Sequence, residues 1–400
     1  MRMRRNARTI GLVLWAVASQ CCAGPDYDAL NEKAKAAFED ERYEKAEALF
    51  EKALAASEKL PDDDVRRAAA QNNMAQFYRA FEREDLAVPY LRAGIEWLVA
   101  HRAPDDPELD KAWTNMAPAY RRLGDLERER EAWKNALVVR EAIHGPRSAP
   151  VADVLNNLAV AEFGLGRFAE ARTVLETAID IWQTEVLADH PNIAAALQNL
   201  AMIDIAEEDP DGAIESYLRA RAVLQRSVGD EHPAIARLWR QIGNAHRMKG
   251  DDLAAVDAFR ESLRRFRGSL GDEHLETART ANSLAVALRA TGDLDGAREW
   301  YDRALPVMEK ELGADHRDVG AIRFNIASLL AADGRDEDAE TLYREALAVL
   351  EDSYGASHPA LAAFLEPWAD FLDRRNLTEE AATVRERVAA LVPIDENEDG

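Results

Sequence analysis

The sequence repeats with a period of 42 residues, and this period restricts the chain to a stack of similar units. Five connectors similar to Gly-Asp-Glu-His-Pro carry histidines 42 positions apart: His190, His232, His274, His316 and His358. Small residues keep the same frame at Ala75, Ala117, Ala159, Ala201, Gly243, Ala285, Ala327 and Ala369. A fixed period of this length is typical of solenoids, in which each unit packs only on its neighbours.

Each unit is predicted to form two helices joined by a tight turn. Leu155 and Leu158 recur at helical spacing, which places them on one apolar face. Gly166 follows, and glycine readily ends a helix because it has no Cβ. Ala171 and Leu175 then begin the apolar face of a second helix. The sequence therefore predicts an all-α fold of stacked antiparallel helix pairs.

The second helices pair a bulky position with a small one. The bulky position is occupied by Trp133, Tyr217, Phe259, Tyr301 and Tyr343. The small position is occupied by Ala136, Ala178, Ala220, Ser262, Ala304 and Ala346. Large side chains opposite small ones allow neighbouring helices to approach closely.

This pattern resembles the tetratricopeptide repeat in its 42-residue kinesin light chain form. The resemblance depends on Leu155-Asn156-Asn157-Leu158-Ala159, Gly166-Arg167-Phe168, Glu170-Ala171 and the histidine connector. It covers roughly residues 62–392. It implies a right-handed superhelical solenoid whose first helices line a concave groove. It also implies a non-catalytic scaffold that binds a peptide or a partner protein in that groove.

The amino terminus has the features of an export signal. Four arginines precede the apolar run Ile10–Ala18, which is too short to span a bilayer. Cleavage is expected after Ala18 or Ala23, so residues 1–23 are predicted to be a signal peptide. An uncleaved anchor is one alternative, and a lipid anchor on Cys21 or Cys22 is another. The mature protein is expected in the periplasm or outside the cell.

Three further segments are expected after the signal. Residues 24–61 match a shorter tetratricopeptide hairpin and are predicted to cap the stack. Residues 62–392 are predicted to form eight 42-residue repeats. Residues 393–400 are acidic and have no apolar period, so they are predicted to be disordered.

The composition limits the possible partners. The formal net charge of −24 argues against nucleic acid, whose binding depends on Lys and Arg that neutralise phosphates. No second long apolar run is present, so no membrane span is expected after processing. A protein or peptide is the expected partner, and its identity and the oligomeric state do not follow from the sequence.

The repeated histidines are interpreted as helix caps rather than metal ligands. Each precedes a first helix, where a side chain can accept a hydrogen bond from a free backbone N–H. Stacked units also separate these loops, so five histidines cannot meet at one ion. No cofactor is expected, and no catalytic motif is present. The alternative function is a small-ligand receptor or enzyme accessory subunit with a pocket at a kink near Pro118, Pro306 or Pro367.

Asparagines in the first helices are unfavourable unless they form specific contacts, because Asn has a low helix propensity. Asn157, Asn199 and Asn325 lie beside core residues and are predicted to bond neighbouring repeats. Asn156 and Asn282 lie one residue earlier and are predicted to face a ligand.

One stripe of the first helices is unusually basic. Helical spacing gives it one acid, Asp153, against Arg79, Lys111, Arg121, Arg237, Arg240, Arg247, Arg279 and Arg289. A merely solvated face is the alternative, but the whole chain has more acids than bases. An extended acidic and apolar segment is therefore the predicted ligand. The predicted contacts are Asn156, Phe163, Met202, Arg237, Arg240, Asn244, Arg247, Arg279, Asn282 and Arg289.

Overall fold

The computed structural model of the protein describes residues 25–185 and 190–391. Every regular element within these ranges is a helix, which confirms the predicted all-α fold. The predicted signal peptide and acidic tail lie outside the described residues. The helices belong to two compact units, which divide between Glu207 and Glu208.

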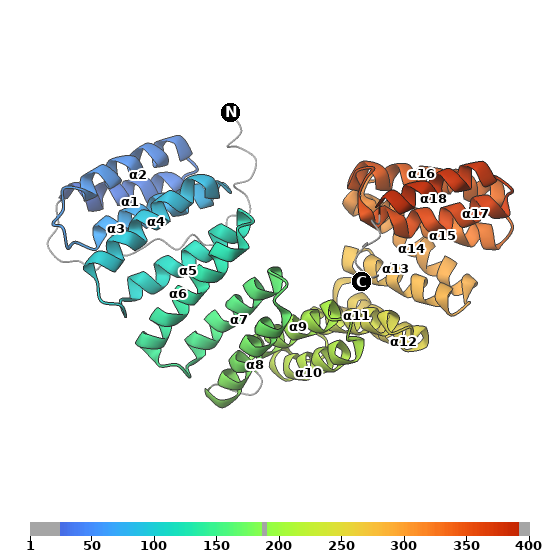
Figure 1. Ribbon diagram of the computed structural model, residues 1–400, viewed down its shortest axis with the longest axis horizontal. Coiled ribbons are helices and arrows are strands. Elements are labelled where there is room, and N and C mark those ends of the chain that lie inside the picture. The colour runs from blue at the N-terminus through green and yellow to red at the C-terminus, as the bar shows by residue number, and fades with distance from the viewer. Residues whose placement is uncertain (1–24, 186–189, 392–400) are drawn as a thin grey trace, which may run out of the picture. The chain divides into compact units, whose positions relative to one another are not determined.

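The first unit contains nine helices within the described ranges. They are α1 (Pro25–Glu39), α2 (Tyr43–Ser57), α3 (Arg66–Arg79), α4 (Glu84–His101), α5 (Pro107–Arg122), α6 (Leu126–His144), α7 (Ala149–Gly164), α8 (Phe168–Glu185) and α9 (Pro191–Ala206). Consecutive helices of this unit pack side by side (Figure 1). A continuous apolar core runs between them from Ala34 to Ala161.

The second unit is built in the same way from the remaining helices. They are α10 (Pro210–Val228), α11 (Pro233–Met248), α12 (Asp252–Leu270), α13 (Leu275–Ala290), α14 (Leu294–Leu312), α15 (Arg317–Ala332), α16 (Asp336–Tyr354), the 3₁₀ turn η2 (Pro359–Leu361), α17 (Ala362–Arg374) and α18 (Thr378–Leu391). The helices α5, α14 and α17 remain continuous through Pro118, Pro306 and Pro367.

The turn inside each helix pair uses one residue with positive φ. Glycine occupies this position in five repeats, for example Gly166 at +71° and Gly292 at +88°. Glu41, Glu82, Glu208 and Asn376 occupy the equivalent positions with φ near +60°. A side chain with a Cβ is strained in this region, so these four turns are less favourable than the glycine turns.

The connector histidines cap the first helices, as the sequence predicts. Nδ1 of His190, His232, His274 and His316 accepts the backbone N–H two residues later at 3.1 to 3.3 Å, and His358 does so at the start of η2. Aspartates cap several second helices in an equivalent way; Asp251, for example, accepts from the Ala254 N–H at 3.1 Å.

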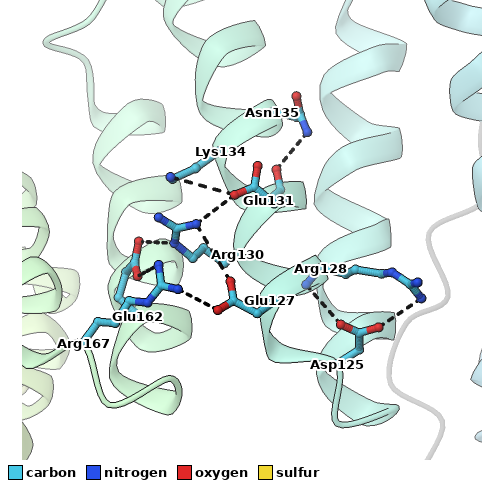
Figure 2. Close-up of polar contacts among 9 residues, drawn as sticks. All are labelled: Asp125, Glu127, Arg128, Arg130, Glu131, Lys134, Asn135, Glu162 and Arg167. Carbon is cyan, nitrogen blue, oxygen red and sulfur yellow. Dashed lines mark hydrogen bonds and ion pairs between the residues drawn. The ribbon is translucent and has the colours of Figure 1, made fainter.

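Buried ion pairs connect the second helix of one pair to the first helix of the next. Arg130 on α6 donates to Glu162 on α7 at 2.7 Å, and Arg167 lies 3.8 Å from the same carboxylate (Figure 2). The contact recurs 42 residues later, where Arg172 on α8 donates to Asp204 on α9 at 2.7 Å. Because both carboxylates are almost fully buried, loss of Arg130 or Arg172 would remove a hydrogen-bonded cation from a buried charge between neighbouring helix pairs.

Candidate partner-binding sites

A polar pocket in the second unit brings together four of the predicted contact residues. Arg240 and Asn244 on α11 and Arg279 and Asn282 on α13 line a pocket of about 350 Å³. Asp318 at the start of α15 also lines it. The helical spacing of the basic stripe therefore identified neighbouring residues on two adjacent first helices.

Two of these arginines are already paired with acids. Glu276 accepts from Arg240 at 2.7 Å and from Arg279 at 3.2 Å. Arg279 also lies 3.5 Å from Asp318. Burial opposes ionisation of Glu276, but Arg240 and then Arg279 outweigh it, so the pKa of Glu276 lies below its ordinary value.

The predicted excess of eight bases over one acid is therefore wrong as a description of this surface. Glu276 and Asp318 each lie one helical turn before the first stripe position of their own helix. Their carboxylates contact the stripe arginines Arg240 and Arg279. Lys111 and Arg121 are also paired, with Glu108 at 2.7 Å and with Glu129 at 2.6 Å. Extending the stripe by one turn toward the start of each helix would have revealed Glu108, Glu276 and Asp318.

Four arginines of the stripe form no ion pair with any described residue, and one of them, Arg79, is half-buried. The other three, Arg237, Arg247 and Arg289, are all exposed. Burial raises the pKa of Tyr301 to about 12, and the charges of Arg289 and Arg247 oppose that rise. The three exposed arginines are the charges available to a ligand.

An apolar patch in the first unit contains the other predicted contacts. Phe163 on α7 and Met202 on α9 line a small pocket of about 30 Å³ together with Val160. Met202 is 48% exposed, which is high for a large apolar side chain. Phe163 also contacts Phe168, with ring centroids 5.5 Å apart. The sequence correctly placed Phe163 and Met202 on adjacent first helices.

The asparagines bond in a different arrangement from the predicted one. Asn199 Nδ2 donates to Asn156 Oδ1 on the preceding first helix at 3.0 Å. The predicted role of Asn199 is confirmed, but Asn156 is its partner rather than a free ligand group. Asn157 instead donates to the Asp153 carbonyl of its own helix at 3.1 Å, so its predicted bond between repeats is wrong.

The three remaining asparagines with predicted roles, Asn244, Asn282 and Asn325, lie in the second unit. Asn244 donates to Gln241 on its own helix at 3.0 Å. Asn282 Oδ1 is buried and has no hydrogen-bond partner among the described residues. The predicted bond from Asn325 to a neighbouring repeat does not form within the described helices, although Asn325 stands 43 positions after Asn282, like Asn199 after Asn156.

The sequence interpretation missed a second pocket in the first unit. It has a volume of about 350 Å³ and lies among α3, α4, α5 and α6. Its walls are mainly apolar, with Leu91, Gly94 and Leu98 from α4 and Ala112 from α5. The signal was present in the repeat alignment, because Leu91 and Gly94 are smaller than most of the residues at equivalent positions.

The described residues provide no sign of a metal centre or of a membrane helix. In residues 25–185 and 190–391, no cluster of three or more His, Cys, Asp or Glu side chains could hold a metal ion. None of the helices in these ranges is long and apolar enough to cross a bilayer.

Comparison with known families identifies the repeats. The family model described as tetratricopeptide repeat matches residues 27–96, 108–184, 150–225, 192–268, 235–310 and 276–352. These matches overlap and together include most of the chain. None of the curated proteins matches the sequence.

Several solved structures share the fold at low sequence identity. The apo form of RapI is 12% identical with a TM-score of 0.66, and the alignment covers 90% of this chain and 97% of RapI. Aspartyl phosphate phosphatase F from Bacillus subtilis is 14% identical with a TM-score of 0.55, covering 95% of this chain and 97% of that protein. BtubC (BKLC) from P. vanneervenii is 19% identical with a TM-score of 0.51, covering 58% and 93%. Likenesses at this level show the fold alone.

Proposed function

The chain belongs to the tetratricopeptide repeat family, and we propose that it is a protein-interaction scaffold that binds an extended acidic segment of a partner protein along α11 and α13. The observation that carries the proposal is the set of three exposed arginines, Arg237, Arg247 and Arg289, without an acidic partner among the described residues.

Arg219 and Arg226 on α10 are also exposed without an acidic partner among the described residues, but Arg237, Arg247 and Arg289 lie together on the first helices α11 and α13. The chain has 74 acids and 50 bases, so acids are in excess to neutralise exposed bases. On the same two helices, Arg240 pairs with Glu276, and Arg279 pairs with Glu276 and Asp318. Arginine binds carboxylates through two parallel N–H donors, which suits an acidic ligand. A segment with carboxylates near Arg247 and Arg289 would supply the missing partners.

The apolar patch at Phe163 and Met202 supports a further contact with a partner protein. Exposed apolar side chains around a pocket commonly mark a protein-binding surface. We therefore extend the proposal to an apolar binding site for a partner protein on the first unit.

The experiment is a selection from a random library of displayed 12-residue peptides on the purified protein. Peptides enriched in Asp and Glu are expected. The variant R237E/R247E/R289E should lose this enrichment. A matched control, R219E/R226E/R260E, changes the same number of charges at exposed positions of α10 and α12 and should keep it.

Catalysis is not part of the proposal. Tetratricopeptide repeats are typically non-catalytic scaffolds. The activity named for phosphatase F belongs to that protein, since 14% identity carries only the fold.

The location of the protein is a separate proposal, based on the sequence of residues 1–23. The arginines before Ile10–Ala18 support export to the periplasm or out of the cell. Intact-mass measurement on protein from its native source tests it. A mass that starts at or after Ser19 is expected, with added lipid if Cys21 or Cys22 is acylated. A mass that includes Met1–Ala18 would contradict export with cleavage.

A further inference from the structure

The pocket between α3 and α5 forms where the repeat carries unusually small side chains. Leu91 stands where other second helices carry Trp133, Tyr217, Phe259, Tyr301 and Tyr343, at multiples of 42 residues. Gly94 stands where others carry Ala136, Ala178 or Ser262. Ala112 on α5 stands where other first helices carry Val154, Leu238 or Ile322, although Leu175 and Ala196 repeat the Leu91 and Ala112 residue types elsewhere. Gly94 is smaller than the residue at each equivalent position of the 42-residue frame, and it helps to leave this space open.

Two asparagines give this pocket the hydrogen-bonding pattern of a peptide group. Asn115 Nδ2 on α5 donates to Asn72 Oδ1 on α3 at 3.1 Å, and both side chains line the pocket. The Asn72 amide N–H groups and the Asn115 carbonyl have no hydrogen bond to any described residue. One free donor group and one free acceptor therefore remain, which complement the C=O and N–H of a backbone amide.

The charged residues of the pocket are already neutralised within the protein. Lys111 pairs with Glu108 at 2.7 Å, so neither leaves a full charge for a ligand. Arg140 binds both carboxylate oxygens of Asp110, at 2.9 and 2.7 Å. A charged ligand would have to break these pairs, whereas an uncharged one would not.

The size of the pocket suits a single side chain. Its volume of about 350 Å³ lies at the lower end of the range for ligand sites, roughly 300–1,000 Å³. A closed apolar cavity of about 150 Å³ already binds benzene in another protein. An open pocket of this volume accommodates a branched aliphatic side chain or an aromatic ring together with the adjoining backbone.

We propose that this pocket binds one uncharged apolar side chain of a partner segment, of the size of leucine or phenylalanine, while Asn72 and Asn115 bond the backbone amide beside it. The inference depends on the proposed function, because it requires a protein ligand. It adds a specificity site in the first unit, away from the acidic recognition proposed for the second.

Capped amino acids test the pocket without knowledge of the partner. N-acetyl-leucinamide and N-acetyl-phenylalaninamide are titrated against the full chain by saturation-transfer NMR. Binding with a millimolar Kd is expected for both, and N-acetyl-serinamide should bind at least tenfold more weakly. Ala112→Leu places in the pocket the residue that Leu238 supplies in another repeat, and should weaken binding at least tenfold. Ala69→Val narrows the same pocket from α3 and provides a second variant if the first does not fold.

Two control variants separate this inference from the proposed function. Ala100→Leu adds the same bulk at an exposed position of α4 and should bind the probes like the wild type. The R237E/R247E/R289E variant should also bind them normally, because its changes lie in the other unit. Probe binding that survives both Ala112→Leu and Ala69→Val would overturn the inference, while leaving acidic recognition intact. Octanoate binding without binding of either amide would overturn it in favour of an acyl-chain ligand.

Discussion

Arg240 on α11 donates a hydrogen bond to Glu276 on α13 at 2.7 Å, and both side chains are only 19% exposed. The pair joins two adjacent first helices across the surface on which we place the ligand. It also removes from that surface the charge of the most central arginine. The acidic ligand is therefore expected to bind the neighbouring unpaired arginines, and the pair is expected to hold α11 and α13 in register.

Glu276→Gln should have opposite effects on stability and on ligand affinity. The change leaves Arg240 without a carboxylate partner and leaves Arg279 with Asp318 alone. A lost hydrogen bond to a charged group costs about 1.5–3 kcal/mol. The freed arginines should at the same time bind an acidic peptide more tightly. Urea unfolding and peptide titration measure the two effects. Glu273→Gln makes the same charge change at an 84% exposed side chain and should change neither stability nor peptide affinity. Lower stability without higher affinity would show that Arg240 does not face the ligand.

The sequence predicts which residues share a face of adjacent first helices better than it predicts their hydrogen-bond partners. Helical spacing correctly placed Phe163 beside Met202 and the histidines at helix starts, because these depend only on the 42-residue period. It could not distinguish Asn156 from Asn157 as the partner of Asn199. That choice depends on the axial offset between adjacent first helices, which brings residues 43 positions apart into contact.

The predicted excess of bases on the stripe was wrong for a related reason. A stripe drawn along one helix excludes a long side chain that reaches it from the next helix. Glu276 reaches Arg240 from α13 in this way, and Asp318 reaches Arg279 from α15. The pocket at Leu91 and Gly94 was visible in the alignment of repeats, but small residues show a cavity only when no neighbour fills the space.

Glu82→Gly should stabilise the first unit. Glu82 has φ of +57° in the turn between α3 and α4, where other repeats use glycine. A residue with a Cβ in this conformation costs about 1–2 kcal/mol, and the greater freedom of glycine in the unfolded chain returns part of that. A net gain of about 0.5–1 kcal/mol in the free energy of unfolding is expected. Glu82→Ala keeps the Cβ and should give no gain, so equal effects of the two changes would refute backbone strain.

His232→Ala should destabilise the second unit through loss of the cap on α11. His232 Nδ1 accepts the Ala234 N–H at 3.2 Å. Removal of a capping side chain costs about 0.5–2 kcal/mol. His232→Asn offers another acceptor at the same place and should retain most of the stability. Thermal unfolding that cannot distinguish the alanine and asparagine variants would argue against a capping role.

Acid should weaken the second unit partly through Glu261. A hydrogen bond from Arg264 lowers the pKa of Glu261 to about 2, against the effect of burial, and Arg265 adds to the lowering. The pKa is lower in the folded protein than its ordinary value of 4.5, so the carboxylate stabilises the fold fully above pH 4.5. That contribution is lost as the pH falls through about 2. The difference in free energy of unfolding between wild type and Glu261→Gln should therefore shrink over this range, and a difference independent of pH would contradict the linkage.

The most direct test of the account is the Kd of a selected acidic peptide, measured by fluorescence anisotropy on three proteins. These are the wild type, R237E/R247E/R289E and the control R219E/R226E/R260E. Each exposed pair of an arginine and a ligand carboxylate contributes about 0.2–1 kcal/mol, and charge reversal adds repulsion. The R237E/R247E/R289E variant should therefore bind at least about tenfold more weakly. The control should bind like the wild type, both variants should keep the wild-type helical circular dichroism, and wild-type binding should weaken as salt rises. A folded R237E/R247E/R289E variant that binds the peptide with the wild-type Kd would contradict acidic recognition by these arginines.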